Sequence, residues 1–359
     1  MKLKNYASLW RMFFNQTPSY LIFFVTSKCN SRCKMCFYWK NIDNFKKNEE
    51  LTVEEIKKIS KGFGHLQYLT ISGGEPFLKE DLQGIVEAFV KQNSTQFVSV
   101  PTNGLLPEKI AEVSEEMFNK CPEAFFRIAL SIDGIGKDHD KIRGVRGNFE
   151  KVKRTYNLLN DLRKNYNNFN IDATTVYSNF NSDKIEDIYN WVEQNMNIDN
   201  HVLLLARGDT RESIAKNISI EGYEKAARFV ERKAASRGLR KKDFRLKILR
   251  AVKLVMREII VKTAKENKMV LPCVAGSKLV VISETGKVYP CEILKMEMGD
   301  LRKNRYDIKK IIFSDEGRKV RKHIKRIKCF CTFECAIQNN IIYNPWTYPS
   351  IIKKILMLK

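Results

Sequence analysis

The feature that most constrains this chain is a run of eight residues with three cysteines, Cys29-Asn-Ser-Arg-Cys33-Lys-Met-Cys36. It directly follows the apolar segment 20–26, whose aromatic and branched side chains predict a buried strand. The cysteines are therefore expected on a loop at the end of a strand. Three thiolates on so short a loop can bind three irons of a cubane cluster and leave the fourth iron open to a small molecule.

Two other uses of these cysteines have to be considered. A disulfide framework is typical of small secreted domains, whereas this chain has 359 residues, nine cysteines and no recognisable signal peptide. A structural zinc site stays open, because closely spaced cysteines also suit tetrahedral zinc and spacing alone does not identify the metal. The loop thus predicts a metal centre whose metal has to be decided by other features.

Strands and helices alternate in the sequence after this loop. A capping box at Thr52 and Glu55 begins a helix that we expect to end near Gly62. Strands are expected at 66–71, 97–100, 125–132, 169–176 and 201–206, and the helices between them at 81–92, from Pro107, at 149–162 and at 183–194. Six strands interleaved with helices predict an α/β fold with a parallel sheet, whose binding sites lie at the carboxyl ends of the strands.

Polar and glycine-containing segments follow the strands at that end of the sheet. They are Ser72-Gly73-Gly74-Glu75-Pro76, Thr102-Asn103-Gly104, Ser131-Ile132-Asp133-Gly134, Ser178-Asn179-Phe180-Asn181 and Arg207-Gly208-Asp209. Each segment taken alone could be an ordinary turn, since Gly, Asn, Asp and Pro are frequent in turns. Five such segments on the same edge as a cysteine loop indicate a binding site.

The C-x3-C-x2-C loop and the Gly73-Gly74-Glu75-Pro76 segment resemble two motifs of the radical S-adenosylmethionine (SAM) superfamily, and the resemblance covers residues 18–210. It implies a partial (β/α)6 barrel, similar to a TIM barrel. It also implies that SAM binds a 4Fe–4S cluster held by Cys29, Cys33 and Cys36. One position departs from the family: Met35 stands where an aromatic residue usually precedes the third cysteine.

The resemblance also implies a set of residues around SAM. In the family, the segment that corresponds to Gly73, Gly74, Glu75 and Pro76 accepts the amino group of SAM. The family positions and the residue types suggest Arg143 for the carboxylate of SAM. Further contacts to SAM or substrate are expected from Asn103, Ser131, Asp133 and Asn179, and from Leu204 and Leu205 beside the adenine, where core packing is the alternative role.

Five more cysteines lie near the C-terminus. Cys273 and Cys291 flank the apolar segments 279–282 and 287–290, which predict a β-hairpin around Thr285-Gly286. The C-x12-G-x4-C spacing resembles the auxiliary-cluster (SPASM) domain of radical SAM enzymes in its shortened, single-cluster twitch form. We expect one auxiliary 4Fe–4S cluster, with zinc still open. The expected ligands are Cys273, Cys291 and Cys335, with Cys329 or Cys331 as the fourth.

These segments suggest a division of the chain. It consists of an N-terminal segment (1–17), a radical SAM partial barrel (18–210), a basic helical connector (211–268), an auxiliary-cluster domain (269–340) and an amphipathic tail (341–359). Cys121 has no partner motif and is expected to be a buried thiol. Cysteines used as metal ligands predict a reducing, cytoplasmic location. No apolar run in the sequence reaches the roughly 18 residues of a membrane span.

The chain is strongly basic, with 64 Lys and Arg against 41 Asp and Glu and a formal net charge of +23. This charge suits an anionic or carrier-linked substrate or an acidic membrane surface, although lysines that only solvate helix faces explain it equally well. The tail could lie on a membrane, giving peripheral contact, or dock as a last helix on the barrel. The sequence shows no nucleic-acid-binding module, so such a partner rests on charge alone.

The resemblance implies that SAM is cleaved reductively to a 5′-deoxyadenosyl radical, which abstracts hydrogen from a substrate C–H bond. With the auxiliary cluster as electron acceptor the reaction would be a net oxidation of a small-molecule, carbohydrate-type or carrier-linked substrate. The reducing partner would be a protein such as flavodoxin or ferredoxin. Position suggests Asp133, Asp209 or Glu292 as the base, and Arg207 for a substrate anion.

Three alternatives remain at this stage. The first is a peptide (RiPP-type) maturase, and the second is a sulfur-inserting enzyme that consumes its auxiliary cluster. The third is a zinc-stabilised nucleic-acid-binding protein, which leaves the five segments at the strand ends without an explanation.

Overall fold

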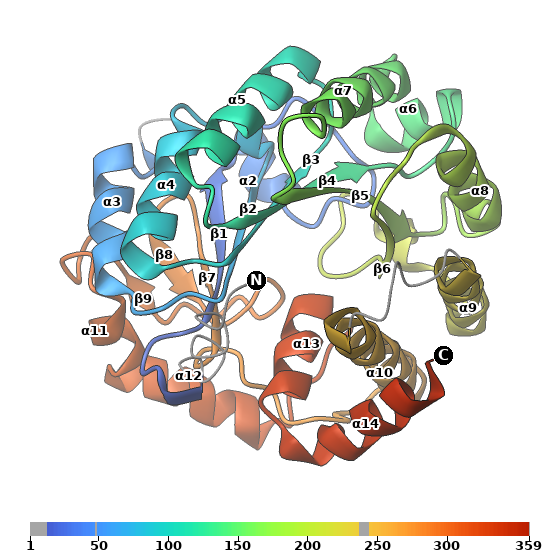
Figure 1. The fold of residues 1–359 in the computed structure, drawn as a ribbon. Coiled ribbons are helices and arrows are strands. Elements are labelled where there is room, and N and C mark those ends of the chain that lie inside the picture. Colours follow the sequence, from blue (N-terminus) through green and yellow to red (C-terminus); the bar gives the residue numbers. More distant parts are fainter. Residues whose placement is uncertain (1–12, 47–48, 237–243, 359) are drawn as a thin grey trace.

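The computed structural model describes residues 13–46, 49–236 and 244–358 (Figure 1). Six parallel strands form one curved sheet in the order β6-β5-β4-β3-β2-β1. They are β1 (Tyr20–Thr26), β2 (Tyr68–Gly73), β3 (Phe97–Thr102), β4 (Phe125–Ser131), β5 (Phe169–Tyr177) and β6 (Asn200–Leu205). Figure 1 shows the sheet curving into a partial barrel with helices on its outer face. The predicted fold class is confirmed.

The outer helices bury one apolar face each against this sheet. They are α3 (Val53–Gly62), α4 (Leu82–Asn93), α5 (Pro107–Lys120), α7 (Asn148–Leu162) and α8 (Ile185–Asn195). The capping box is present, since the Thr52 hydroxyl accepts from Glu55 N and the Glu55 carboxylate accepts from Thr52 N. Cys121 follows α5 and is fully buried, as expected. Within the barrel segment 18–210, two short helices were not predicted, α2 (Trp39–Asp43) and α6 (Lys137–Arg143).

The C-terminal strands extend the barrel sheet. β7 (Leu279–Ile282) pairs in parallel with β1, from Tyr20 opposite Leu279 to Phe23 opposite Ile282. The predicted hairpin is confirmed, because β8 (Lys287–Tyr289) returns antiparallel to β7 and is followed by β9 (Gly299–Asp300). The cluster-domain segment therefore shares one nine-stranded sheet and one continuous apolar core with the barrel.

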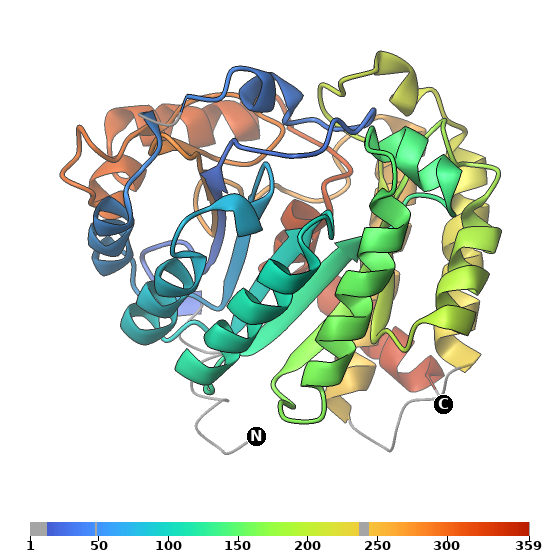
Figure 2. The same ribbon diagram turned by 90° about the horizontal axis from the view of Figure 1, so that it is seen from above.

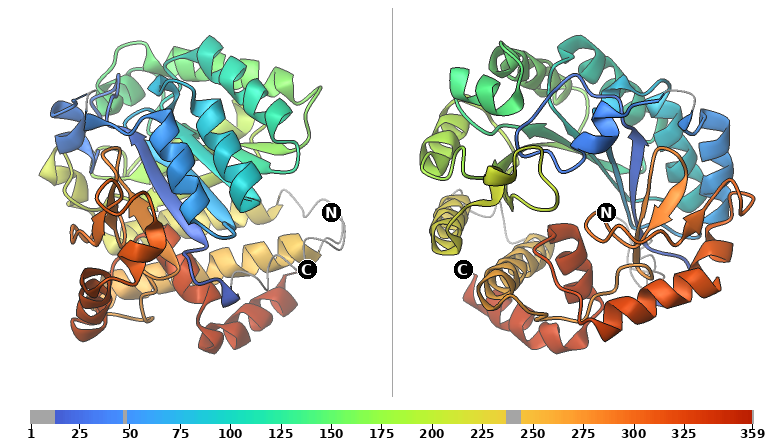
Figure 3. Two further views of the ribbon diagram at one scale, coloured as in Figure 1. Left: turned by 90° about the vertical axis from the view of Figure 1, so that its left-hand side faces the viewer. Right: turned by 180° about the vertical axis from the view of Figure 1, so that it is seen from behind.

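Helices from the C-terminal half stand on the remaining side of the barrel. α9 (Ile220–Ser236) packs beside α8 and β6, and α10 (Phe244–Glu266) packs against α13 (Glu334–Ile342) and α14 (Tyr348–Met357). Figure 1 and the back view in Figure 3 place α10 and α13 between β6 and β7. The other elements are α11 (Ile308–Ile312), α12 (Asp315–Arg326) and the 3-10 turns η2 (Pro76–Leu78), η3 (Ser213–Lys216) and η4 (Pro345–Thr347). Over the part of the chain that the structure describes, no helix has the length and apolar character of a membrane span.

An ion pair ties α3 of the barrel to the segment after β9. Arg302 donates to both carboxylate oxygens of Glu55, at 2.7 and 3.0 Å, and Tyr306 Oη donates to the same carboxylate at 3.0 Å. The hydrogen bonds from Arg302 lower the pKa of Glu55 to about 2. The ionised form of Glu55 therefore stabilises the fold above the ordinary carboxyl pKa of 4.5.

We expect Glu55→Gln to lower the free energy of unfolding near neutral pH by about 1 kcal/mol, since the pair is partly exposed to solvent. The difference between variant and wild type should shrink as the pH falls from 4.5 toward the folded pKa of about 2. Urea denaturation at a series of pH values measures this. Glu54→Gln is the control, because Glu54 is exposed on the same helix turn. The same pH dependence in both variants would contradict the assignment to Glu55.

Candidate metal and cofactor site

The cysteine loop leaves β1 in direct backbone contact with the glycines that end β2. Gly74 N donates to Thr26 O at 2.7 Å, and Glu75 N donates to Lys28 O at 2.9 Å. A Cβ on Gly73 would lie 2.2 Å from Thr26 O, and a Cβ on Gly74 would lie 2.2 Å from Lys28 O. Only glycine allows this approach, so the first role of the Gly-Gly pair in this fold is to fix the start of the cysteine loop.

The other side of the loop rests on the end of α6. Arg32 N donates to Arg143 O at 3.1 Å, and the Ser31 hydroxyl donates to the same oxygen at 3.2 Å. Gly144 follows with a φ of +71°, and a Cβ there would lie 2.6 Å from Arg32 O. The loop is thus held between the ends of β2 and α6.

The loop carries three half-buried free thiols, those of Cys29, Cys33 and Cys36. Burial raises the pKa of Cys29 to about 11 and that of Cys36 to about 12, and the nearby Cys33 thiol acts in the same direction on both. Without a metal these two thiols carry their protons, and binding of iron would release them. Loop geometry and donor set both fit a cluster that binds one iron per thiol.

Arg143 lies buried next to this loop and presents an unused donor. Its Nη1 donates to Asp133 Oδ2 at 3.0 Å, and Asp133 Oδ1 accepts from Val176 N at 2.8 Å. Burial alone would lower the pKa of Arg143, but the neighbouring Cys33 and Asp133 raise it, so the guanidinium stays charged. Arg143 Nε is buried and has no hydrogen-bond partner. A buried cationic donor of this kind fits an anionic ligand such as a carboxylate.

Glu75 is directed at the neighbouring loop after β3. Its buried carboxylate accepts from Asn103 N and from the Thr102 hydroxyl, both at 2.8 Å, and from Phe77 N at 3.3 Å. Burial raises the pKa of Glu75 to about 7, although these donors act in the opposite direction. The Glu75 carboxylate, which was predicted to accept the amino group of SAM, is therefore engaged by three protein donors. It connects the loop after β2 to the loop after β3. Pro76 begins η2 directly behind it.

The structure brings Asn103 to the cysteine loop. Its Nδ2 donates to Asn30 Oδ1 at 2.8 Å and lies 4.0 Å from Cys29 Sγ. Ser131 ends β4 and is half-buried, and Leu205 ends β6 and is buried beside the half-buried Leu204. These residues lie at the carboxyl ends of the strands, where the sequence predicted the binding site, and we call this edge of the sheet the rim.

Asn179 does not join this group, because it is exposed. The buried amide of the same segment belongs to Asn181, whose Nδ2 donates to the backbone oxygens of Asp133 and Val176, both at 3.0 Å. The Ser-Asn-Phe-Asn sequence of residues 178–181 did not show which asparagine turns inward.

A buried histidine that sequence reasoning missed links the rim loops. His139 Nδ1 accepts from Asp133 N at 3.2 Å, and His139 Nε2 lies 3.2 Å from Asn148 Oδ1. Asn148 Nδ2 donates in turn to Asn103 O at 3.0 Å. Burial lowers the pKa of His139 to about 3, which keeps the ring neutral. Segment 137–143 has no apolar periodicity, so no local pattern indicated this helix.

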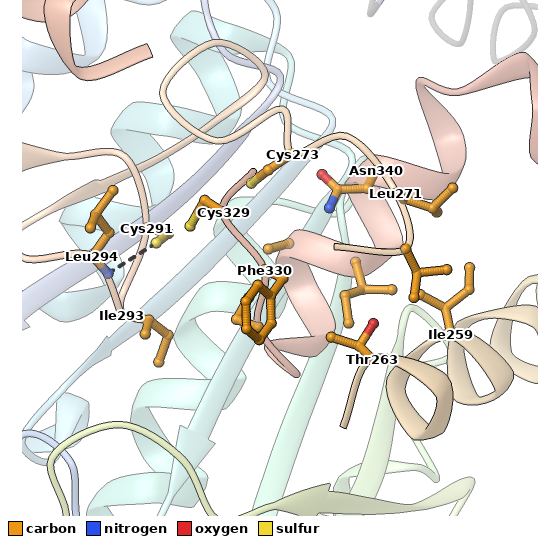
Figure 4. A pocket seen from close by; sticks show the side chains of 14 residues that line it. Ile259, Thr263, Leu271, Cys273, Cys291, Ile293, Leu294, Cys329, Phe330 and Asn340 are labelled. Atoms are coloured by element: carbon orange, nitrogen blue, oxygen red, sulfur yellow. Dashed lines mark hydrogen bonds between the residues drawn. The ribbon is translucent and has the colours of Figure 1, made fainter. Parts of the chain in front are cut away.

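A second group of thiols lies in the C-terminal half. Cys273, Cys291, Cys329 and Cys331 line one pocket together with apolar side chains that include Leu271, Ile293 and Phe330. Figure 4 shows the sulfur atoms of Cys273, Cys291 and Cys329 on the same side of this pocket. Burial raises the pKa values of Cys291 and Cys331 to about 12, and nearby thiols contribute to both shifts. Among the described residues, no three His, Cys, Asp or Glu side chains come close enough to hold a single metal ion. Cluster ligands instead bind separate irons.

Cys335 is the fifth cysteine of this half, and the sequence predicted it as a ligand together with Cys273 and Cys291. It does not line the pocket, and its sulfur accepts from Tyr20 Oη of β1 at 3.2 Å. The reason is local: α13 begins at Glu334, so Cys335 sits in a helical turn while Cys329 and Cys331 stay on the preceding loop. The C-x-C-x3-C spacing alone does not show where this helix begins.

Arg207 at the end of β6 is shared by two buried glutamates. Its Nη1 donates to Glu334 Oε2 at 2.7 Å, and its Nη2 donates to Glu292 Oε2 at 3.3 Å. The guanidinium also lies over the ring of Phe333, with its carbon 4.7 Å from the centroid. Arg207, which was predicted to bind a substrate anion, is thus neutralised by two carboxylates. It connects the barrel to the cluster domain. The sequence did not single out Glu334.

The three candidate bases occupy different environments. Asp209 is exposed and pairs with Lys40 at 2.6 Å, whose hydrogen bond lowers the pKa of Asp209. Asp133 has both oxygens engaged by Arg143 and the sheet. Glu292 is buried beside Arg207 and directly follows Cys291 of the thiol pocket.

Family comparisons agree with these two sites. Residues 23–192 match the family described as the radical SAM superfamily, and residues 273–336 match the SPASM iron–sulfur cluster-binding domain. The chain belongs to the radical SAM superfamily. Radical SAM proteins bind SAM and a 4Fe–4S cluster, and SPASM domains bind auxiliary iron–sulfur clusters, as the motifs indicated.

Curated relatives cover different shares of this chain. The AdoMet-dependent heme synthase of Nitratidesulfovibrio vulgaris is 26% identical over 77% of this chain and 74% of its own length. The probable GTP 3′,8-cyclase of Archaeoglobus fulgidus is 36% identical over 36% of this chain. The matches to this cyclase and to that of Methanococcus maripaludis C5 span only 40% and 41% of those proteins.

Solved structures of radical SAM proteins share the fold. The structure of anSMEcpe with bound AdoMet aligns with 95% of this chain and 100% of its own, with a TM-score of 0.59 and 18% identity. Streptococcus suis SuiB bound to S-adenosylmethionine aligns over 95% of this chain and 78% of its own, with a TM-score of 0.62 and 16% identity. At this identity the likeness concerns the fold alone.

The contact between Gly74 and Lys28 gives a test of how the cysteine loop is held. We expect Gly74→Ala to lower the iron content after anaerobic reconstitution from about eight to about four per chain, because the added Cβ displaces the loop. Gly147→Ala is the control, since Gly147 precedes α7 and an added Cβ there has nothing within 4 Å. That variant should keep its iron and lose only about 1 kcal/mol from its positive φ. Equal iron in both variants would contradict the role assigned to the close contact.

Proposed function

We propose that this chain is a radical SAM oxidoreductase that acts on a small-molecule, carbohydrate-type or carrier-linked substrate. When bound, a reduced 4Fe–4S cluster supplies the electron that cleaves SAM to methionine and a hydrogen-abstracting 5′-deoxyadenosyl radical, and an auxiliary cluster can accept the electron that the substrate loses. The observation that carries the proposal is the presence of two thiol sets, one on the loop after β1 and one in the pocket beside α13.

The residues around the first set have distinct roles in this proposal. Cys29, Cys33 and Cys36 hold the cluster, and Arg143 binds the carboxylate of SAM through the Nε that lacks a partner. Asp133 holds the Arg143 guanidinium in place. The backbone of Gly73 and Gly74 receives the amino group in place of the Glu75 carboxylate, which the loop after β3 already occupies. Asn103, Ser131 and Leu205 line the remaining rim.

The second set has one thiol for each iron of a 4Fe–4S cluster. Cys273, Cys291, Cys329 and Cys331 would leave no iron open, which suits electron transfer better than direct binding of substrate. Cys335 is then a free thiol outside the cluster. This supports a net oxidation, since a cluster with no open iron can take up an electron but cannot bind substrate.

The substrate proton needs an acceptor near this pocket. We assign this role to Glu292, because its side chain is only 7% exposed and it directly follows Cys291. Asp209 is exposed and held by Lys40, and Asp133 is engaged by Arg143. Arg207 becomes a positioning residue for Glu292 and Glu334 and no longer a site for a substrate anion.

The names of the curated relatives favour a small substrate. They refer to heme and to GTP. A peptide is the second candidate, because SuiB bound to its precursor peptide SuiA shares this fold with a TM-score of 0.61. The two classes can be separated by experiment.

The cluster assignment is tested by iron and sulfide analysis after anaerobic reconstitution. The wild type should hold about eight irons, and the Cys29, Cys33 and Cys36→Ala variant about four. Cys273→Ala combined with Cys329→Ala should also leave about four, whereas Cys335→Ala is the matched control and should keep about eight. Loss of iron on Cys335→Ala would show that this thiol is a ligand. Zinc in place of iron at the second set would remove the proposed electron acceptor.

Reductive cleavage of SAM gives the functional readout. With dithionite as reductant, the wild type and Cys335→Ala should release 5′-deoxyadenosine, and the Cys29, Cys33 and Cys36→Ala variant should release none. Deuterated candidate peptides and small molecules then identify the substrate class, because only a true substrate transfers deuterium into 5′-deoxyadenosine. No release of 5′-deoxyadenosine from a chain with full iron content would overturn the proposal.

A further inference from the structure

Exposed apolar side chains are concentrated in the segment from η4 to the end of α14. Five of the twelve large hydrophobic side chains that the described residues leave exposed lie there. They are Trp346, Tyr348, Ile352, Leu356 and Met357, with exposed fractions of 88%, 38%, 56%, 81% and 65%. Single exposed hydrophobic residues are common on proteins, but such a cluster marks an interaction surface.

Three of these residues form one stripe on α14. Tyr348, Ile352 and Leu356 are spaced four residues apart, so they follow one another along the same face of the helix. Ile351 and Ile355 are more buried, and α14 packs against α10. Figure 1 shows α14 on the outer side of α10. One side of α14 is therefore covered by the protein, and an apolar stripe faces outward.

The surroundings of this stripe are cationic. Residues 343–359 contain three lysines and no acidic residue, and residues 244–257 of α10 contain five Lys or Arg. Glu258 of α10 follows and pairs with Lys354 of α14. Lys247 Nζ of α10 donates to Leu358 O at 3.0 Å, which brings this part of α10 to the end of α14. Leu249, two residues further along α10, is half exposed. We call the surface formed by Trp346, α14, Lys247 and Leu249 the α14 surface.

The charge decides which partner fits the α14 surface. A second copy of this chain would bring the same excess of cations to the contact, within a net charge of +23 per chain. An anionic membrane surface offers both hydrocarbon for the stripe and negative headgroups for the lysines. Trp and Tyr side chains such as Trp346 and Tyr348 are typical of the depth where headgroups meet acyl chains.

We propose that the α14 surface docks this protein peripherally on an anionic lipid membrane, with the stripe in the interface. Figure 2 shows α14 and the C-terminal end at one edge of the molecule and the cysteine-loop region near α2 at the opposite edge. A docked molecule would thus keep the cysteine loop away from the lipid. The proposal does not depend on the reaction assigned above.

The experiment uses the full chain, reconstituted with iron and sulfide, and sedimentation with vesicles of phosphatidylcholine alone or mixed with phosphatidylglycerol. We expect binding to the mixed vesicles that weakens as salt rises. The double variant Ile352→Ser, Leu356→Ser should bind at least about tenfold more weakly, because two apolar side chains leave the interface. Phe313→Ser is the matched control, since Phe313 is a half-exposed aromatic residue after α11, away from the α14 surface.

A second pair of variants tests the charge. Lys353→Glu on α14 should weaken binding, and Lys109→Glu on α5 should leave it unchanged. Circular dichroism and iron content verify that each variant is folded. The proposal is overturned if the wild type does not bind the mixed vesicles, or if Phe313→Ser weakens binding as much as the double variant. It is also overturned if the wild type self-associates in solution and the double variant does not, since the surface would then be covered by a second copy.

Discussion

Backbone-to-backbone contact fixes the cysteine loop, and the geometry of the whole rim depends on it. Two hydrogen bonds connect Gly74 and Glu75 to the start of the loop, and two more connect its middle to the end of α6. There is no room for a side chain at Gly74 or Gly144. The positions of the three thiols are therefore determined by β1, β2 and α6, whose own places are set by the buried core of the barrel.

Two buried arginines form the polar centres of the molecule. Arg143 is oriented by Asp133 beside the cysteine loop, and Arg207 is oriented by Glu292 and Glu334 beside the thiol pocket. Buried ion pairs contribute little to stability after desolvation, so their main effect is to orient the groups. In both arginines the buried Nε has no partner among the described residues. An unmet buried donor costs about 1–3 kcal/mol, and an anionic ligand at Arg143 would recover it.

The sequence allowed the six barrel strands, the outer helices and the β7–β8 hairpin to be predicted, because their apolar periodicity and turn residues are local signals. It did not reveal that β7 pairs with β1, since long-range strand pairing leaves no trace in spacing. Helix α6 and its buried His139 were missed because their residues are polar. Cys335 does not line the pocket of the other four thiols, since α13 begins at Glu334, a helix start that no local pattern indicated. The motifs of the candidate site could thus be predicted from the sequence, whereas the side chains and strands that contact them could not.

The continuity of the sheet from β6 to β9 has a consequence for electron flow. With a cluster in each thiol set, both would be attached to one sheet, since the Cys29 loop follows β1, Cys291 follows β8, and β7 pairs with both β1 and β8. The rate of electron tunnelling falls steeply with distance. A fixed distance between the two clusters would therefore give the same tunnelling rate in every catalytic cycle. The timing of electron transfer would then depend on the reduction potentials of the clusters and on ligand binding, because the distance between the two redox centres would stay constant.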